Sequence, residues 1–196
     1  MGVMRHFTAF YDEPNLLKRI NADVLAWDMW ALEQICFRCA PDFMTIGEDV
    51  TYNHGPMLSK AMFDEFMAPY YRELTALIRG HDIVCMVDSD GNVNELCGRL
   101  HEVGVQGLLP FEVQAGSDVA QVRAAIPDFR VIGGFDKMTM TRGPAAMRAE
   151  FERLLPELRR GYFIPSVDHQ TPPGVSVAQY LEYLALLWEY TECAVE

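Results

Sequence analysis

The stretch "DIVCMVDSDGNVNELCGRLHEVGVQGLLPFEV" (residues 82–113) contains the pattern that decides the fold. It opens with an apolar run, "IVCMV", which is followed by a polar turn and by Leu96, Leu100 and Val103 at helical spacing. A second apolar run, "VQGLLPF", completes the unit. Strands that are apolar on both faces and alternate with amphipathic helices are typical of a parallel β/α sheet.

The same alternation covers most of the 196 residues. Further strand-like runs are predicted at 42–50, 129–137 and 162–169, and helices at 59–80, 117–126, 143–161 and 176–190. We expect Pro69 to kink the first of these helices, because proline lacks a backbone N–H.

The number of strands limits the choice of fold. A closed TIM-type (β/α) barrel needs eight strands and typically about 250 residues, whereas about five strand-like runs are present in this chain. We therefore predict an α/β fold that is either an open sheet or a partial TIM-type barrel whose first strands are missing. The whole chain, 1–196, is expected to form a single domain, with N-terminal helices (1–40) before the β/α units (41–196).

Composition and charge exclude several classes of partner. A formal net charge of −12 disfavours nucleic acid and anionic membranes, because both bind basic surfaces. No apolar stretch approaches the roughly 20 residues of a membrane span, and the first residues do not resemble a signal peptide. Five cysteines without regular spacing argue against a disulfide framework, so we expect a reduced, cytoplasmic protein.

Acidic side chains follow every predicted strand. They are Glu48 and Asp49, Asp88 and Asp90, Glu112, Asp136, and Asp168 next to His169. In parallel β/α folds, ligands bind at the carboxyl ends of the strands. One such acid alone would be an ordinary helix cap or loop residue, but acids after all of the strands indicate a binding site.

The residue types indicate chemical roles. Histidine is the side chain suited to proton transfer at physiological pH, so His169 could act as general acid or base, while Asp168 would either orient His169 or cap the next turn. Asp88 and Asp90 share one face of an extended strand, so they could hold a cation or share a proton. The alternative for this pair is a tight turn at Asp90-Gly91. His54 could contact a ligand from the loop after the first strand.

Five segments carry a resemblance to a known family. They are "IGEDV", "GPMLSKAMFDEFMAPYYREL", "VDSDGNVNELCGRLHEVGVQGLLPFEVQAG", "RVIGGFDKMTM" and "GYFIPSVDHQTPPGVSVAQYLEYL". In this order they resemble the uroporphyrinogen decarboxylase family, which also includes cobalamin-dependent methyltransferases. The resemblance spans roughly residues 12–190. It implies a (β/α) barrel of eight strands, of which this chain would hold the last five.

The resemblance also implies roles for particular residues. His169 matches a histidine that faces the substrate in the decarboxylases, and Asp90 matches the aspartate of their acid-glycine turn. The family's N-terminal aspartate and carboxylate-binding arginines have no counterpart, so turnover of uroporphyrinogen by this chain alone is not expected. In the methyltransferase branch, histidine and cysteine hold zinc. Asp88 and Asp90 stand at those positions here, and with His169 and either Glu48 or Glu112 they would suit Mg²⁺, Mn²⁺ or Zn²⁺.

The expected function is an enzyme of this family that performs decarboxylation or methyl transfer on a small molecule. Candidate catalytic residues are His169, Asp90 and Asp168, and candidate ligands of a divalent metal are Asp88, Asp90 and His169. Candidate substrate-binding residues are Glu48, Asp49, His54, Glu112 and Asp136. Expected partners are a corrinoid protein, a companion chain that supplies the missing strands, or further copies in a homo-oligomer. The alternative is a non-catalytic half-barrel that binds a ligand or completes a partner, since five parallel strands leave two open sheet edges.

Overall fold

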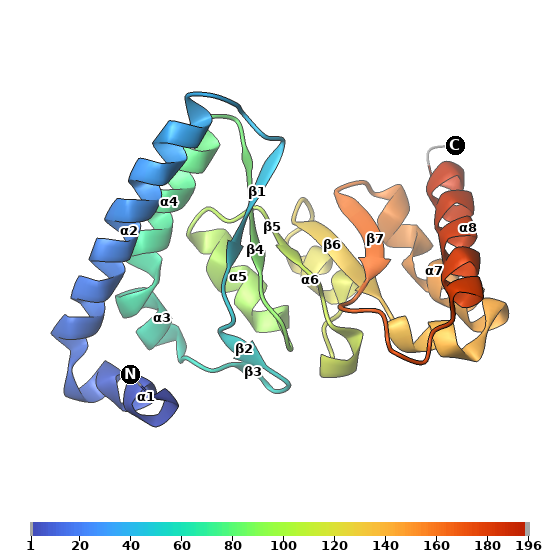
Figure 1. Cartoon of the computed structure of the whole chain (residues 1–196), viewed down its shortest axis with the longest axis horizontal. Coiled ribbons are helices and arrows are strands. Elements are labelled where there is room, and N and C mark those ends of the chain that lie inside the picture. The colour runs from blue at the N-terminus through green and yellow to red at the C-terminus, as the bar shows by residue number, and fades with distance from the viewer. Residues whose placement is uncertain (1, 195–196) are drawn as a thin grey trace.

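The computed structural model describes residues 2–194 and contains a sheet of five parallel strands (Figure 1). The strands are β1 (Phe43–Gly47), β4 (Val84–Asp88), β5 (Gly107–Leu109), β6 (Arg130–Phe135) and β7 (Phe163–Val167). They lie in the order β1-β4-β5-β6-β7, and every neighbouring pair is parallel. This arrangement confirms the prediction of a partial TIM-type barrel.

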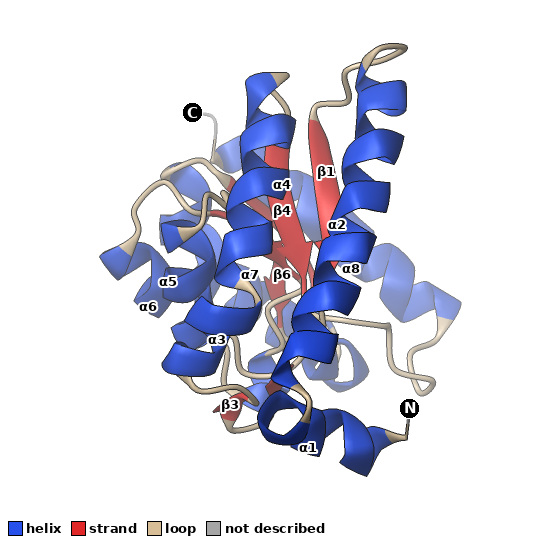
Figure 2. Ribbon diagram, turned by 90° about the vertical axis from the view of Figure 1, so that its left-hand side faces the viewer, coloured by secondary structure: helices blue, strands red, loops and turns tan. Residues whose placement is uncertain are grey.

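Helices separate the strands, as the alternating pattern predicts. They are α3 (Lys60–Phe66), α4 (Ala68–Gly80), α5 (Asn94–Glu102), α6 (Val119–Ala125), α7 (Pro144–Arg159) and α8 (Val177–Cys193), while α1 (Val3–Asp12) and α2 (Pro14–Cys36) precede the first strand. Figure 1 shows α2 and α4 near β1 at one end of the sheet and α7 and α8 near β7 at the other. Seen from the α2 and α4 side, in Figure 2, these two helices stand in front of the strands. None of the helices within residues 2–194 is both long and apolar enough to span a membrane.

The main hydrophobic core joins the inner strands to the helices that follow them. Cys85 of β4, Leu100 of α5 and Phe135 of β6 are completely buried in it. The outer strands are less covered, since Phe43 of β1 is 47% exposed and Ile164 of β7 is 59% exposed. Strand β1 pairs with β4 and β7 pairs with β6, so each outer strand has one edge without a strand partner in the described part of the chain.

The helix predicted at 59–80 is two helices in the structure. Ser59 caps α3, because its hydroxyl accepts a hydrogen bond from the Met62 N–H at 3.2 Å. This helix ends at Phe66, and Pro69 lies in the first turn of α4, where a missing N–H breaks no intrahelical hydrogen bond. Pro69 therefore helps to begin a new helix instead of kinking a continuous one.

Two further features differ from the predicted pattern. A hairpin of β2 (Thr51–Tyr52) and β3 (Gly55–Pro56) follows β1, and strands of two residues are too short to show alternation. The helix predicted from Ser117 begins after Asp118, whose carboxylate accepts from two N–H groups of α6 at 2.8 and 3.2 Å. The Ser117 hydroxyl instead donates to the Gly91 carbonyl at 2.8 Å, which joins the loop after β4 to the start of α6.

Candidate functional site

The carboxyl ends of the strands form a cleft of about 520 Å³, which we call the strand-edge cleft. This volume lies within the range of small-molecule sites. The cleft brings together four of the predicted acids and the predicted histidine: Glu48, Asp49, Asp88, Asp90 and His169. The other lining residues are Gly47, Leu109, Pro110, Ile132, Gly133, Ser166, Val167 and Gln170. No lysine or arginine is among these lining residues.

His169 and Asp90 are in contact within the strand-edge cleft. His169 Nε2 lies 3.4 Å from Asp90 Oδ2, and the two side chains are 35% and 46% exposed, so a ligand can reach both. The Thr51 hydroxyl donates to the Asp90 carbonyl, and the Asp90 N–H donates to Asp49 Oδ1 at 3.4 Å. Burial raises the pKa of the Asp90 carboxyl, the nearby His169 lowers it, and neighbouring acids raise it again. The pair can hold a proton and pass it to a bound molecule.

Glu48 follows the last residue of β1 and is partly buried. Its N–H donates to the Asp88 carbonyl at 2.8 Å, which extends the pairing of β1 with β4 into the cleft. The Tyr71 hydroxyl donates to Glu48 Oε2 at 3.0 Å. Burial raises the pKa of the Glu48 carboxyl, the Tyr71 hydrogen bond lowers it, and the charge of Asp49 raises it. Glu48 is thus the least solvated of the candidate substrate-binding acids in the cleft.

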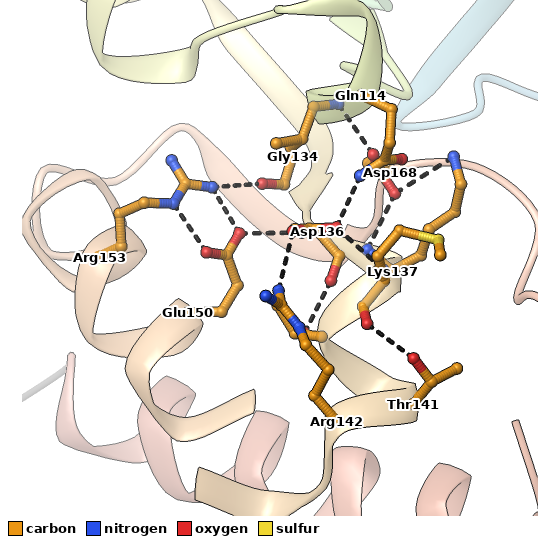
Figure 3. Close-up of polar contacts among 12 residues, drawn as sticks. Gln114, Gly134, Asp136, Lys137, Thr141, Arg142, Glu150, Arg153 and Asp168 are labelled. Carbon is orange, nitrogen blue, oxygen red and sulfur yellow. Dashed lines mark hydrogen bonds and ion pairs between the residues drawn. The ribbon is translucent and has the colours of Figure 1, made fainter. Parts of the chain in front are cut away.

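Asp168 is completely buried and contacts backbone groups of two other strand ends (Figure 3). Its carboxylate accepts from the Val113 N–H at 2.8 Å and the Lys137 N–H at 3.1 Å, and it lies 3.5 Å from Lys137 Nζ. Burial raises the pKa of the Asp168 carboxyl, and the two backbone hydrogen bonds oppose that rise. These contacts, rather than a contact with His169 or with the next turn, occupy the side chain. Asp168 therefore joins the loops after β5 and β6 to the end of β7.

Three other predicted residues lie outside the lining of the strand-edge cleft. Glu112 accepts from the Gly91 N–H at 2.9 Å, which holds the turn that carries Asp90. Asp136 caps the 3₁₀ helix η2 (Lys137–Arg142) by accepting from the Met138 N–H at 2.9 Å, and it also accepts from Gln114 (Figure 3). His54 lies exposed at the tip of the β2–β3 hairpin.

Lys137 does not line the strand-edge cleft, but it contacts two of the predicted acids, Glu112 and Asp168, and the sequence interpretation missed it. Its Nζ lies 3.5 Å from both Glu112 Oε1 and Asp168 Oδ1, and its side chain is largely buried. A continuous set of contacts therefore runs from Asp168 through Lys137 and Glu112 to the turn at Gly91, beside Asp90. The signal in the sequence was a lysine directly after an acid at a strand end, in "GGFDK".

The predicted metal ligands do not form a three-ligand set. Among residues 2–194, no three His, Cys, Asp or Glu side chains are arranged to hold one metal ion. Asp90 contacts His169, and Asp88 lines the same cleft, but the three do not converge on one point. The divalent metal stays a prediction.

A second cavity of about 440 Å³, which we call the helical pocket, lies between the N-terminal helices and the end of β1. Aromatic side chains form much of its wall: Phe7, Phe10, Phe66, Tyr70 and Tyr71. These residues come from α1, α3 and α4, so no single stretch of the sequence carries the pocket's pattern.

The fold and the cleft together define the class of the protein. A parallel β/α sheet with polar residues gathered at the carboxyl ends of its strands is the arrangement of barrel-type α/β proteins. The family model described as uroporphyrinogen decarboxylase (URO-D) matches residues 4–189, and the chain belongs to this family. No curated protein sequence matches the chain significantly.

Among solved structures, the chain is similar to a methyltransferase from Methanosarcina mazei, with a TM-score of 0.62 and 16% sequence identity. The match covers 97% of this chain and 54% of that chain, so this chain spans about half the length of its structural neighbour. At this level of identity the similarity shows the fold.

Proposed function

We propose that the chain is an enzyme of its family that takes a methyl group from a small, neutral or cationic donor, with His169 as the general acid. The observation that carries the proposal is the contact of His169 with Asp90 inside the strand-edge cleft. A leaving oxygen needs a proton, and His169 is exposed enough to supply one. The Asp90 carboxylate, 3.4 Å from His169 Nε2, can stabilise the protonated imidazole, and the 35%-exposed ring can regain its proton from solvent.

The charge of the strand-edge cleft supports this choice of donor. Four acids and no lysine or arginine line it. Such a site attracts cations and repels carboxylates, so a polycarboxylate such as uroporphyrinogen is a poor ligand for this chain. Decarboxylation, which begins from a carboxylate, is disfavoured for the same reason. The methyltransferase from Methanosarcina mazei, which has the same fold, supports methyl transfer by analogy.

A methyl ether illustrates the proposed reaction. The bond between the methyl carbon and the ether oxygen breaks, the methyl group passes to an acceptor, and the oxygen takes a proton from His169. We propose a corrinoid on a separate protein as the acceptor, whose reduced cobalt supplies the electron pair of the new bond. We propose a cytoplasmic location, because a reducing compartment would keep the corrinoid reduced. The exposed free thiols of Cys39 and Cys193 would also persist there.

Incubation of the full chain with cob(I)alamin and anisole tests the proposal. We expect phenol and methylcobalamin to form, and the rate to fall at least about tenfold in His169→Gln. His81→Gln is the matched control, because His81 is exposed and precedes the amino end of β4, whereas the cleft lies at the carboxyl ends of the strands. Equal rates for parent and His169→Gln would contradict the proposal, as would release of carbon dioxide from uroporphyrinogen without demethylation of anisole.

The open sheet edges favour a second candidate, an auxiliary half-barrel that completes a partner. Phe43 on β1 and Ile164 on β7 are exposed apolar side chains on strands that each lack one neighbour within residues 2–194. A companion chain with parallel β/α units would cover both. Light scattering of the chain, alone and mixed with the product of an adjacent reading frame, tests this candidate. A mixed complex would support the companion chain, and a homo-oligomer would support self-association through the open edges. A monomer in both samples would contradict the companion chain and self-association alike.

A further inference from the structure

The strand-edge cleft and the helical pocket share one wall. Gly47, Glu48 and Asp49 line both cavities. The Glu48 carboxyl is held on the helical side by the Tyr71 hydroxyl at 3.0 Å, and Tyr71 lines the helical pocket but not the cleft. The Glu48 N–H remains bonded to the Asp88 carbonyl at the cleft. Glu48 therefore stands at the junction of an acidic cleft and an aromatic pocket.

The helical pocket suits the apolar body of a ligand. The Phe10 ring meets the Phe66 ring edge to face, with 5.1 Å between centroids, and Phe7 and Tyr70 extend the same wall. The volume of about 440 Å³ is sufficient for a small aromatic molecule. Burial of an aromatic body against such walls is a main source of small-molecule affinity.

The charges of both cavities favour a cation. No lysine or arginine lines either one, and each is lined by one histidine, His6 in the helical pocket and His169 in the cleft. Glu48 and Asp49 line both cavities, Asp28 lines the helical pocket, and Asp88 and Asp90 line the cleft. A cation beside a partly buried carboxylate is attracted more strongly than one in bulk water. Burial removes water from the Glu48 carboxylate and so raises its pKa. A bound cation would replace part of the lost stabilisation of the charged form.

We propose that the helical pocket and the strand-edge cleft form one binding site for an amphipathic cation with an aromatic body. The aromatic body lies in the helical pocket, its protonated amine lies beside Glu48, and any further arm of the molecule extends into the cleft. The binding of this class of ligand stands on the two cavities. Only the placement of a reacting group near His169 rests on the proposed function.

Calorimetric titration of the full chain with tryptamine and with indole-3-propionate tests the proposal. The two probes share a ring and a two-carbon linker but carry opposite charges. We expect tryptamine to bind at least about tenfold more tightly, and Glu48→Gln to remove most of that difference. Val24→Trp and Met57→Trp, which fill the helical pocket from two different segments, should each weaken both probes about tenfold. Val177→Trp is the control, since Val177 is exposed on α8 and lines neither cavity.

Several outcomes would overturn the inference. Equal affinities for the two probes would refute the role of Glu48, and tryptamine affinity unchanged in both pocket-filling variants would refute the helical pocket as the site. Thermal melting of each variant identifies any that is misfolded, and the second filling variant then carries the test. If the parent chain binds tryptamine in a Glu48-dependent way but does not demethylate anisole, the proposed function alone is refuted.

Discussion

Replacement of Asp168 by alanine should destabilise the chain far more than replacement of Asp118, although each carboxylate accepts two backbone hydrogen bonds. Asp168 is completely buried and accepts from the N–H groups of Val113 at 2.8 Å and Lys137 at 3.1 Å. Asp118 is exposed and accepts from two N–H groups at the start of α6 at 2.8 and 3.2 Å. The comparison therefore sets buried against exposed hydrogen bonds from backbone to carboxylate, and Asp168 additionally loses its contact with Lys137 Nζ at 3.5 Å.

The expected magnitudes follow from what replaces each carboxylate. A buried N–H left without an acceptor costs about 1–3 kcal/mol, and we use the lower part of that range because Val113 and Lys137 are only partly buried. The two groups together give a loss of about 2–4 kcal/mol in the free energy of unfolding for Asp168→Ala. At Asp118 water can reach the freed N–H groups, so losing this helix cap should cost about 1 kcal/mol.

Urea unfolding followed by circular dichroism measures both losses, provided that the slopes of the transitions agree. Asp168→Asn is an informative third variant, because asparagine keeps the shape and one acceptor oxygen but presents an amide N–H₂ to a backbone donor. We expect its stability to lie between those of the parent and Asp168→Ala. Equal losses for Asp168→Ala and Asp118→Ala would refute the claim that burial gives the Asp168 contacts their strength.

Three further predictions concern other parts of the fold. Gly133→Ala should lower the free energy of unfolding by more than about 3 kcal/mol, because φ is +123° and an added Cβ would lie 1.8 Å from the Pro110 carbonyl oxygen. Cys85 should react with dithionitrobenzoate at least about a hundredfold more slowly than the exposed Cys39, because burial raises the pKa of the Cys85 thiol to about 12. Burial raises the pKa of Glu48 above its ordinary value of 4.5, so the folded chain holds this proton more tightly than the unfolded chain. Stability should therefore fall as pH rises from that ordinary value through the raised one, and urea unfolding across this range should show a smaller fall in Glu48→Gln.

The glycine and cysteine predictions have matched controls, and the Glu48 prediction has a result that would contradict it. Gly80→Ala at the end of α4 should change stability by less than about 0.5 kcal/mol, since an added Cβ there meets no atom within 4 Å. Cys193 is exposed and should react at the rate of Cys39, and equal labelling of Cys85 would contradict its burial. Parallel pH profiles for the parent and Glu48→Gln would show that Glu48 does not contribute to the pH dependence.

The strands could be predicted because consecutive residues of a buried strand are apolar. Cys85, Met86 and Val87 are all buried in β4, so the strand appears in the sequence as an unbroken apolar run. The break between α3 and α4 could not be predicted in this way. Phe63 packs in the main core, whereas Phe66 packs with residues of α1 and α2 in a separate cluster. The division between these clusters depends on distant segments, which local spacing does not reveal.

The composition of the cleft was easier to predict than the role of each acid. Acids after the strands were expected to meet, and Glu48, Asp49, Asp88 and Asp90 line one cleft with His169. Asp168 was expected either to orient His169, its neighbour in the chain, or to cap the next turn. After the end of β7, these consecutive side chains instead lie on different sides of the chain. Asp168 is buried, whereas His169 is exposed to the cleft. The partners of Asp168 come from loops after β5 and β6, and their approach depends on the folded sheet.

The order of strands across the sheet equals their order along the chain, apart from the separate β2–β3 hairpin. A chain that leaves the ribosome amino end first can therefore add one β/α unit at a time to an edge that already exists. No strand has to be inserted between two others, and each loop that must close spans a single unit. Under a mechanical force applied to the two ends of the chain, the same order would let the sheet separate unit by unit from β1 or from β7 inward.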